Sequence, residues 1–520
     1  MSMFHWMERK LKFANQRRKR NSLRLPDQSV SLELDKNVSY LKDIFKKSSD
    51  IVFHSFFIGI DKRVEAALVS VDGLYDKTEI HEHVLQPLQN YEFQQKGKEA
   101  LNQLDRTLLQ IQSVQKMTGM EQSIDLLLKG DSLLFVDGIS KVYIIGARAW
   151  EMRSIDEPVT ETVVRGPREG FVETLRTNTS MIRRKIHHPN LQIQQITLGN
   201  ITKTDVAIVY IDTIVSTEIL GEVKRRLQRI EMDGILESGY IEELIEDAPF
   251  SPFPTVANTE RPDVVASRIL EGRVAIIVEG TPTVLVVPHL MFESFQSAED
   301  YYSRPYYSSF VRILRFLGFM VSTLAPAFYV ASQDYHKEIF PSELLITVAA
   351  SREGVPFPLI IEVFLLLITF EWLREAGIRM PKPIGQAVSI VGALILGEAA
   401  VNAGFVGAPT VIIVAVSAIT SFMVASMADT AAILRLVYLI AAAILGFYGV
   451  MLAVSFFLLH TASLRSFGIP YMSPLMPLSP PEWRDFLVRA PLWTLNRRPE
   501  SLRPMEEIKQ ESDQKPHPPK

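Results

Sequence analysis

The last third of the chain constrains its fold most, because it holds a series of long apolar segments. These segments begin near Arg312 and end near His460, after a long stretch with the mixed polar and apolar pattern of a water-soluble protein. About 20 apolar residues in a helix are enough to cross the hydrocarbon core of a bilayer. The layout therefore predicts a large water-facing region followed by a multi-pass membrane region.

Five segments are candidate membrane helices, and they fall within a predicted domain of residues 301–465. Their approximate bounds are 311–331, 355–374, 384–403, 408–427 and 431–460. The stretch 342–354 is shorter and carries charges, so we interpret it as an interfacial or re-entrant helix. We therefore expect four to five spanning helices.

The region before the apolar segments predicts two α/β subdomains, residues 31–155 and 156–300. Alternating apolar stretches end in Asp72-Gly73 and Asp137-Gly138, which is a strand-then-turn signal. The tails are polar: residues 1–30 are basic, and residues 466–520 are rich in Pro, so we expect disorder in the first and at 497–520 in the second. The predicted fold class is an α/β soluble N-terminal region of two subdomains, followed by an all-α multi-pass transmembrane domain.

The side of the membrane on which each end lies is only partly predictable. The N-terminus has no apolar stretch of the kind a signal peptide needs, and basic residues flank the predicted spans, so we expect the N-terminal domain in the cytoplasm. Five spans would put the C-terminal tail on the other side. The basic residues of the tail instead favour a cytoplasmic position; they are Arg465, Arg484, Arg489, Arg497 and Arg498. We favour a cytoplasmic tail, and the number of spans stays open.

Composition excludes several functions. The chain has no cysteine, which rules out disulfides, thiol catalysis and thiolate metal sites. Its net charge of −4 gives no sign of nucleic-acid binding. The basic cluster at residues 17–20 fits contact with anionic lipid, or a solvated tail. No phosphate loop, paired-His spacing or nucleophile elbow is present, so we expect no enzyme activity, no catalytic residue, no metal and no cofactor.

Several unusual sequence blocks carry a family resemblance. Arg261, Pro262 and Asp263 lie in an ERPD block, and Pro356 and Pro358 lie in the block SREGVPFP. Further blocks are DAPFSPFPT at 247–255, LEGRV at 270–274, EGTP at 279–282, LREAGIRMP at 373–381, IVGAL at 390–394 and FGIPYMSP at 467–474. Over residues 35–480 the chain resembles the A subunit of bacterial spore germinant receptors, the GerA family.

The resemblance implies a role in starting spore germination in response to nutrients, in the inner membrane of the endospore. It also implies partners: a transporter-like B subunit, a lipoprotein C subunit and further copies of the chain in a ring that forms a nutrient-gated cation channel. It does not identify the nutrient. A monomeric transporter and a non-conducting membrane scaffold remain alternatives. In the family pattern a Gln is common where this chain has Glu398, so the charge here could alter ion selectivity or be protonated and silent.

The acidic residues of the apolar segments fall into two groups. Glu371 has Arg374 at i+3 and Glu375 has Arg379 at i+4, which are the spacings of local ion pairs. Charged groups deeper in a membrane face protein or water. Two such candidates are Glu362 and Glu398, the second with Asn402 at i+4 on the same helix face. Both fit a pore, and both equally fit hydrogen bonding between packed helices.

Overall fold

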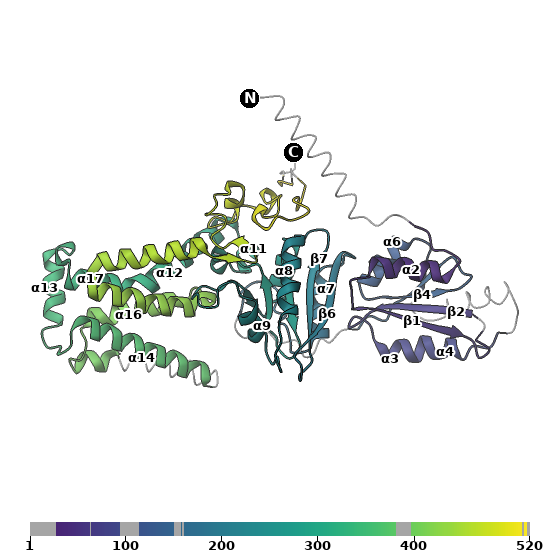
Figure 1. The fold of residues 1–520 in the computed structure, drawn as a ribbon, viewed down its shortest axis with the longest axis horizontal. Helices are drawn as coiled ribbons and strands as arrows, with labels where there is room; N and C mark the ends of the chain where they lie inside the picture. Colours follow the sequence, from purple (N-terminus) through teal and green to yellow (C-terminus); the bar gives the residue numbers. More distant parts are fainter. Residues whose placement is uncertain are drawn as a thin grey trace, which may run out of the picture.

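The computed structural model describes residues 28–511 and 514–516, apart from 63, 94–113, 150–157, 159–160 and 381–396. Three parts lie in a row along the long axis of the molecule: two α/β subdomains and a bundle of helices (Figure 1). The predicted fold class, an α/β region of two subdomains followed by an all-α region, is confirmed. The basic cluster at 17–20 and most of the predicted N-terminal tail lie outside the described residues.

The first subdomain is a five-stranded antiparallel sheet with helices on both faces. Its strand order is β1-β2-β4-β5-β3. Its elements are α2 (Leu34–Ile44), β1 (Ile51–Ile58), β2 (Val64–Val71), α3 (Lys77–Ile80), a π-helical turn (His81–Leu85), α4 (Gln86–Gln89), β3 (Val114–Met117), α6 (Met120–Leu128), β4 (Ser132–Val136) and β5 (Val142–Ile145). Successive residues of β2 point to opposite faces: Ala67 and Val69 pack with α2 and α6, while Ala66 and Leu68 pack with α3 and α4.

The second subdomain repeats the topology of the first. Its strand order is β6-β7-β9-β10-β8, which is the first order shifted by five strands. Its elements are α7 (Leu175–Lys185), β6 (Leu191–Leu198), β7 (Thr204–Ile211), α8 (Thr217–Gln228), α9 (Ser238–Ile245), β8 (Ala257–Thr259), α10 (Pro262–Leu270), β9 (Val274–Val278) and β10 (Val284–Val287). The helices occupy corresponding places in the order, so the soluble region is an internal repeat.

Glycines at matching turns support the repeat. Gly59 follows β1 with φ +88°, and Gly199 follows β6 with φ +87°. Gly130 follows α6 with φ +102°, and Gly272 follows α10 with φ +103°. These are left-handed backbone conformations that glycine adopts without a steric cost. The turns have therefore kept their glycines in both copies.

A buried ion pair fills the junction between the two subdomains. Arg183 on α7 donates from Nε and Nη2 to the carboxylate of Asp50, both at 3.0 Å, and both side chains are buried. The backbone N–H of Ser49 also donates to the carbonyl of Ile193 at 2.9 Å. The two subdomains are thus joined by direct polar contacts at this point.

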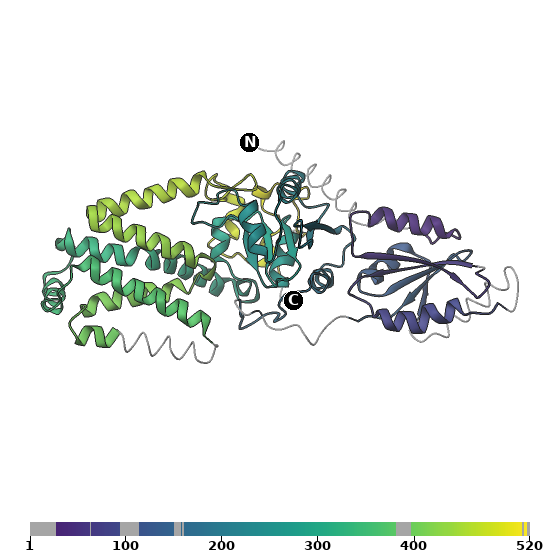
Figure 2. The same cartoon turned by 60° about the horizontal axis from the view of Figure 1, so that its bottom comes forward.

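The helical region extends away from the second subdomain, and its helices lie side by side (Figure 2). Its elements are a 3-10 turn (Met291–Phe295), α11 (Glu299–Tyr302), α12 (Pro305–Asp334), a 3-10 turn (Lys337–Ile339), α13 (Ser342–Ser351), α14 (Leu359–Arg379), α16 (Ala408–Ser421), a 3-10 turn (Ala425–Met427) and α17 (Ala428–Ser463). Two described helical stretches, Pro305–Asp334 and Ala425–Ser463, are long and apolar enough to cross a membrane. The predicted span 384–403 falls mostly outside the described residues.

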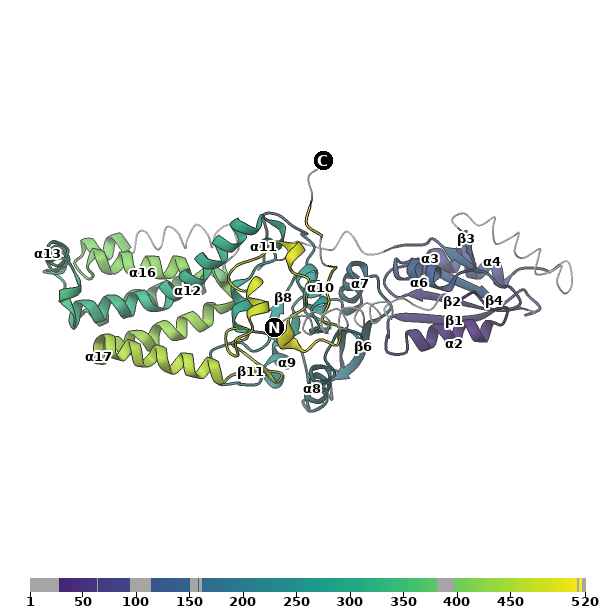
Figure 3. The ribbon, with the colours of Figure 1, turned by 90° about the horizontal axis from the view of Figure 1, so that it is seen from above.

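Helix α17 is a helical hairpin, whereas the sequence analysis expected a single span over 431–460. Gly446 has φ 59° and ψ −142°, which is not helical. The rings of Tyr438 and Phe457 lie 5.8 Å apart, although in a continuous helix residues at that separation would be about 28 Å apart. The chain therefore reverses at Gly446, and Figure 3 shows the two limbs side by side.

The two ends of α17 lie against the second subdomain. The Thr430 hydroxyl donates to the carbonyl of Pro252, and the Ser251 hydroxyl lies 2.9 Å from Nε2 of His460. The turn lies at the far end of the bundle, where the Tyr335 hydroxyl donates to the carbonyl of Ala443 at 2.6 Å. The bundle therefore begins and ends on the side of the α/β region, which is the arrangement that the basic residues of the tail favour.

The C-terminal tail folds back over the second subdomain. Its short elements are β11 (Arg465–Ser466), β12 (Ile469–Pro470) and 3-10 turns at Pro480–Arg484, Leu492–Thr494 and Glu500–Leu502. The polar composition of 497–520 predicts disorder, but residues 497–511 are packed in the structure. Leu502 is buried, Arg498 donates to the carbonyl of Leu270 at 2.8 Å, and the N–H of Met505 donates to the carbonyl of Ile214 at 3.0 Å. Tertiary contacts thus order a segment whose composition is polar.

Candidate functional site: polar residues of the helical bundle

Glu362 lies in the interior of the bundle, where its carboxylate joins three segments. Its Oε1 accepts from Nη2 and Nε of Arg352 at 2.8 and 3.1 Å. Its Oε2 accepts from the backbone N–H of Gly407 at 3.1 Å and from the Thr410 hydroxyl at 3.2 Å. The side chain is fully buried. Four hydrogen bonds and one counter-charge therefore satisfy this carboxylate within a single chain.

The prolines of the SREGVPFP block set the depth of Glu362. Pro358 is the N-cap of α14, with an extended backbone, so the helix begins at Leu359. Glu362 is consequently in the first turn of α14, whereas the sequence analysis placed it well inside a span of 355–374. Pro356 lies in the extended approach to this helix and is exposed. The two prolines thus bring Glu362 level with the start of α16.

Pro326 explains a second polar contact inside the bundle. A proline has no N–H, so it leaves the carbonyl four residues earlier without its helical partner. That carbonyl belongs to Ser322, and it accepts from Nε of Arg435 at 2.8 Å and from the Ser417 hydroxyl at 2.7 Å. Arg435 also lies 3.4 Å from Glu371. Pro326 therefore leaves the Ser322 carbonyl of α12 available to accept hydrogen bonds from α16 and α17.

The ion-pair candidates of α14 lie at the end of the helix that points back toward the α/β region. Nη2 of Arg374 lies 2.8 Å from Glu371, and Nε of Arg379 donates to Glu375 at 2.7 Å. The second pair is well exposed, so solvent screens it. Glu371 is the member of this group with a further partner on another helix.

Glu398 and Asn402 differ from Glu362 because both are exposed on the outer surface of the bundle. They lie in a helical stretch that is described from residue 397 onward, beside the start of α16, where Gly397 faces Val411. Gly407, a few residues later, binds Glu362. The structure therefore places the Glu398–Asn402 face near the far end of the bundle and separates it from Glu362.

The ERPD block begins helix α10 and connects it to neighbouring segments of the second subdomain and to α11. Arg261 is the N-cap of α10, Pro262 is its first residue, and the guanidinium of Arg261 is buried. That guanidinium lies 2.8 Å from Asp263 and donates to the carbonyl of Pro167 at 3.0 Å. Asp263 also accepts from the Tyr302 hydroxyl at 2.5 Å. The block thus ties α10 to α11, directly before the first long helix.

A charged network that the sequence does not predict joins α11 and the C-terminal tail to α12. Asp300 accepts from Nε of Arg312 at 2.8 Å and from Nη2 of Arg315 at 2.7 Å. Although burial alone would raise it, the two guanidinium groups hold the pKa of Asp300 below its usual value. Asp485 in the tail accepts from Nη1 of Arg312 at 2.8 Å. The signal available in the sequence was the pair of arginines at the entry of the span, but their acidic partners come from other segments.

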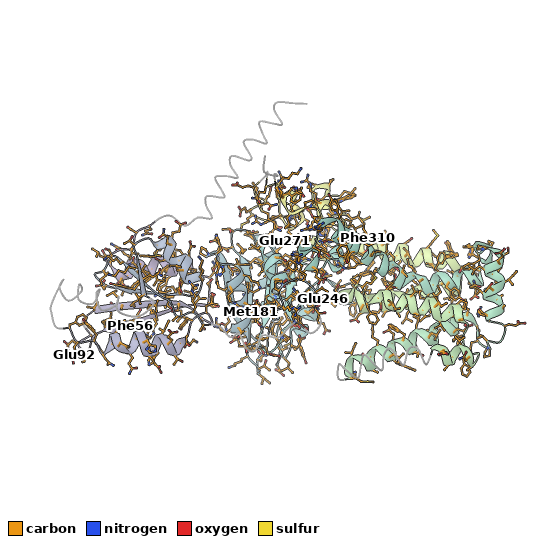
Figure 4. The ribbon with its side chains drawn as sticks, turned by 180° about the vertical axis from the view of Figure 1, so that it is seen from behind. Phe56, Glu92, Met181, Glu246, Glu271 and Phe310 are labelled. Carbon is orange, nitrogen blue, oxygen red and sulfur yellow. The ribbon has the colours of Figure 1, made fainter. Side chains whose placement is uncertain are left out.

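A carboxyl at the same boundary has an unusual pKa. Glu246 ends α9, and Figure 4 shows it on the part of the second subdomain that faces the bundle. Partial burial, together with the negative charge of Glu242, raises the pKa of Glu246 to about 7. It is one of a run of acidic groups that also includes Glu243 and Asp247.

Comparison with known proteins identifies the family. The family model described as Bacillus/Clostridium GerA spore germination protein matches residues 39–501. The chain belongs to the GerA family. It is 46% identical to spore germination protein KA of Bacillus subtilis over 94% of this chain and 90% of that protein. It is 42% identical to spore germination protein GerLA of Bacillus cereus over 84% of this chain and 89% of that protein.

A solved structure also matches this GerA-family chain. It is the N-terminal domain of the A subunit of the Bacillus megaterium spore germinant receptor GerK3, at 36% identity and a TM-score of 0.41, over 51% of this chain and 98% of that one. Both of the relatives named above are described as spore germination proteins. In the described part of the chain, no group of three or more His, Asp or Glu side chains is arranged to hold a metal ion.

Proposed function

We propose that this chain is the A subunit of a spore germinant receptor and helps to start germination in response to nutrients. Relatives named as spore germination proteins support the role over nearly the whole chain. Its partners are a transporter-like B subunit, a lipoprotein C subunit and further copies of itself. Residues 17–20, which lie outside the described residues, add an electrostatic contact with anionic lipid.

The helical bundle crosses the inner membrane of the spore several times, with the α/β region and the tail both in the cytoplasm. The length and apolar character of α12 support a membrane crossing, and both limbs of the α17 hairpin are apolar as well. The reversal at Gly446 supports the orientation, because it returns the chain to the side of the soluble subdomains.

Several copies form a ring around a cation path, and Glu398 and Asn402 line that path. The observation that carries this proposal is the contrast between two acidic residues. Glu362 is buried with four hydrogen-bond donors, whereas Glu398 lies on the outer surface of the bundle. A carboxylate on the surface of a bundle that lies in a membrane requires water or a protein partner. A water-filled path shared by several copies supplies this water. A ring of carboxylates around the path favours cations over anions.

Ion flux tests the path. The chain is reconstituted in liposomes, alone and with its B and C subunits, and the permeability ratio of potassium to chloride is measured. We expect Glu398→Gln to lower this ratio severalfold, because it removes one negative charge per copy from the path. Glu375→Gln is the matched control: it makes the same chemical change at an exposed ion pair on another helix, and it should leave the ratio unchanged.

Two results would count against the proposal. Liposomes that hold the complete receptor and nutrient but pass no cations would exclude a channel. A ratio that is the same for Glu398→Gln and the unchanged chain would exclude Glu398 from the path.

A further inference from the structure

We propose that the cleft between the second subdomain and the C-terminal tail binds a small oxyanion of the phosphate class. The cleft has a volume of about 110 Å³ and opens to solvent between α10, β9 and the tail. Figure 4 labels Glu271, one of its lining residues, on the side of the subdomain that the tail covers. Six cationic side chains line it: Arg268, Arg273, Arg484, Arg497, Arg498 and Lys509.

Five acidic side chains line the same cleft: Glu271, Glu293, Glu482, Asp485 and Glu500. Glu293 forms a two-pronged pair with Arg273, which donates from Nη1 at 2.6 Å and also from Nη2. Asp485 binds Arg312, which is outside the cleft, and it accepts from the Tyr301 hydroxyl at 2.8 Å. Glu293 also lies 3.4 Å from Arg268, so it neutralises the cations of the wall formed by α10 and the start of β9. The cations of the tail are therefore the ones that remain to bind a ligand.

Glu482 is likewise committed within the tail. Its Oε1 accepts from the N–H of Ser501 at 2.8 Å, and its Oε2 accepts from the Ser501 hydroxyl at 2.9 Å. Glu271 has the longest ion-pair contacts among these acids: its oxygens lie 3.6 Å from Arg268 and 3.7 Å from Lys509. These distances are longer than those of a charge-assisted hydrogen bond.

Three cations from the tail keep hydrogen-bonding capacity toward the cleft. Arg484 donates to the carbonyl of Thr494 at 3.3 Å, and Arg497 lies 3.5 Å from Glu500. Lys509 has its long contact with Glu271. Each group has several donors, so most of them are free to bind a ligand. At the floor of the cleft, Nε of the buried Arg273 makes no hydrogen bond to a described residue, although an oxygen of Glu271 lies 3.8 Å away.

The class of ligand follows from the guanidinium and ammonium donors that the tail presents to the cleft. Guanidinium groups bind the oxygens of phosphate or carboxylate with two hydrogen bonds each, and a compact anion with several oxygens can engage arginines from both walls. A volume of this size holds such an anion together with a few waters. The same chemistry is available in inorganic phosphate and in the headgroup of an anionic lipid.

Occupancy would fasten the tail to the second subdomain. Arg484, Arg497 and Lys509 come from the tail, while Arg268 and Arg273 come from α10 and the start of β9. One anion between the two sets links them through charge. The same tail binds α12 through Asp485, so a ligand that holds the tail in place would also stabilise the contact between the tail and the bundle.

Thermal unfolding of the full chain in a neutral detergent tests the site. Inorganic phosphate is titrated against potassium chloride at equal ionic strength, so that general screening cancels. We expect phosphate to raise the melting temperature and to slow proteolysis of the tail, since a ligand of the folded state stabilises it by mass action. The double substitution Arg484→Gln/Arg497→Gln should weaken apparent phosphate binding by about 10-fold or more, as expected for lost charged hydrogen bonds.

The control removes the same charge elsewhere: Arg225→Gln/Arg229→Gln alters two exposed arginines of α8 or its end and should respond to phosphate as the unchanged chain does. Lys509→Gln gives a second, milder variant. Nanodiscs of phosphatidylcholine with and without phosphatidylglycerol distinguish the sources. Stabilisation by the anionic lipid alone, lost in the double variant, identifies a headgroup site. Equal responses in the double variant and the control, or no response to either anion, would overturn the proposal.

Discussion

At the scale of single residues, two glutamates of the bundle differ in what surrounds them. Glu362 has an arginine, a helix N-terminus and a hydroxyl as partners, all from its own chain. Glu398 is exposed and close to the same end of the bundle. The sequence could identify both as acidic residues in apolar segments, but it could not separate them, because the partners of Glu362 come from a loop ten residues away and from α16.

We expect the ion pair between Glu362 and Arg352 to contribute strongly to the stability of the fold. Arg352→Met leaves a buried carboxylate without its counter-charge, which costs about 3–5 kcal/mol of stability. Arg379→Met breaks an exposed pair of the same type and should cost less than about 1 kcal/mol. Unfolding in detergent measures both. The double change Arg352→Met/Glu362→Gln should recover part of the loss, and equal costs for the two single changes would contradict this role.

At the scale of elements, the alternation of residues and the turn sequences predict the strands. They do not predict the features that depend on contacts between distant segments. Alternating strands before Asp72-Gly73 and Asp137-Gly138 are present as β2 and β4. The hairpin of α17 was missed because its apolar run has no polar break. Its reversal occurs at one glycine, Gly446, which packs against Tyr335 at the C-terminal end of α12. The repeat of the two sheets was missed because it lies mainly in strand order and turn glycines.

The hairpin makes a prediction about sidedness that single cysteines can test, because the chain contains none of its own. Ile201→Cys reports the soluble region, Val488→Cys the tail and Tyr448→Cys the turn; all three positions are exposed. In sealed membrane vesicles, an impermeant thiol reagent should label the first two from one side and the third from the other. Labelling of the tail from the side opposite to Ile201 would show that α17 crosses once.

At the scale of the whole molecule, ion pairs and hydrogen bonds connect the first subdomain to the second and the second to the helical bundle. The two subdomains join through Asp50 and Arg183. The second subdomain joins α11 through Asp263 and Tyr302, and Asp300 of α11 pairs with Arg312 of α12. The tail returns from the bundle and binds Arg312 as well. These contacts connect the bundle to the α/β region, and an anion in the tail cleft would lie close to them.

The size of the assembly tests the central claim most directly, because one copy cannot enclose a path lined by Glu398 on its outer surface. The measurement is the protein mass of the full chain in mild detergent, by native mass spectrometry or light scattering, with and without its partner subunits. We predict a closed ring of at least three copies, with a mass that is a whole multiple of 58.8 kDa for the chain alone. A chain that stays monomeric under every condition, including in the complete receptor, would contradict the channel.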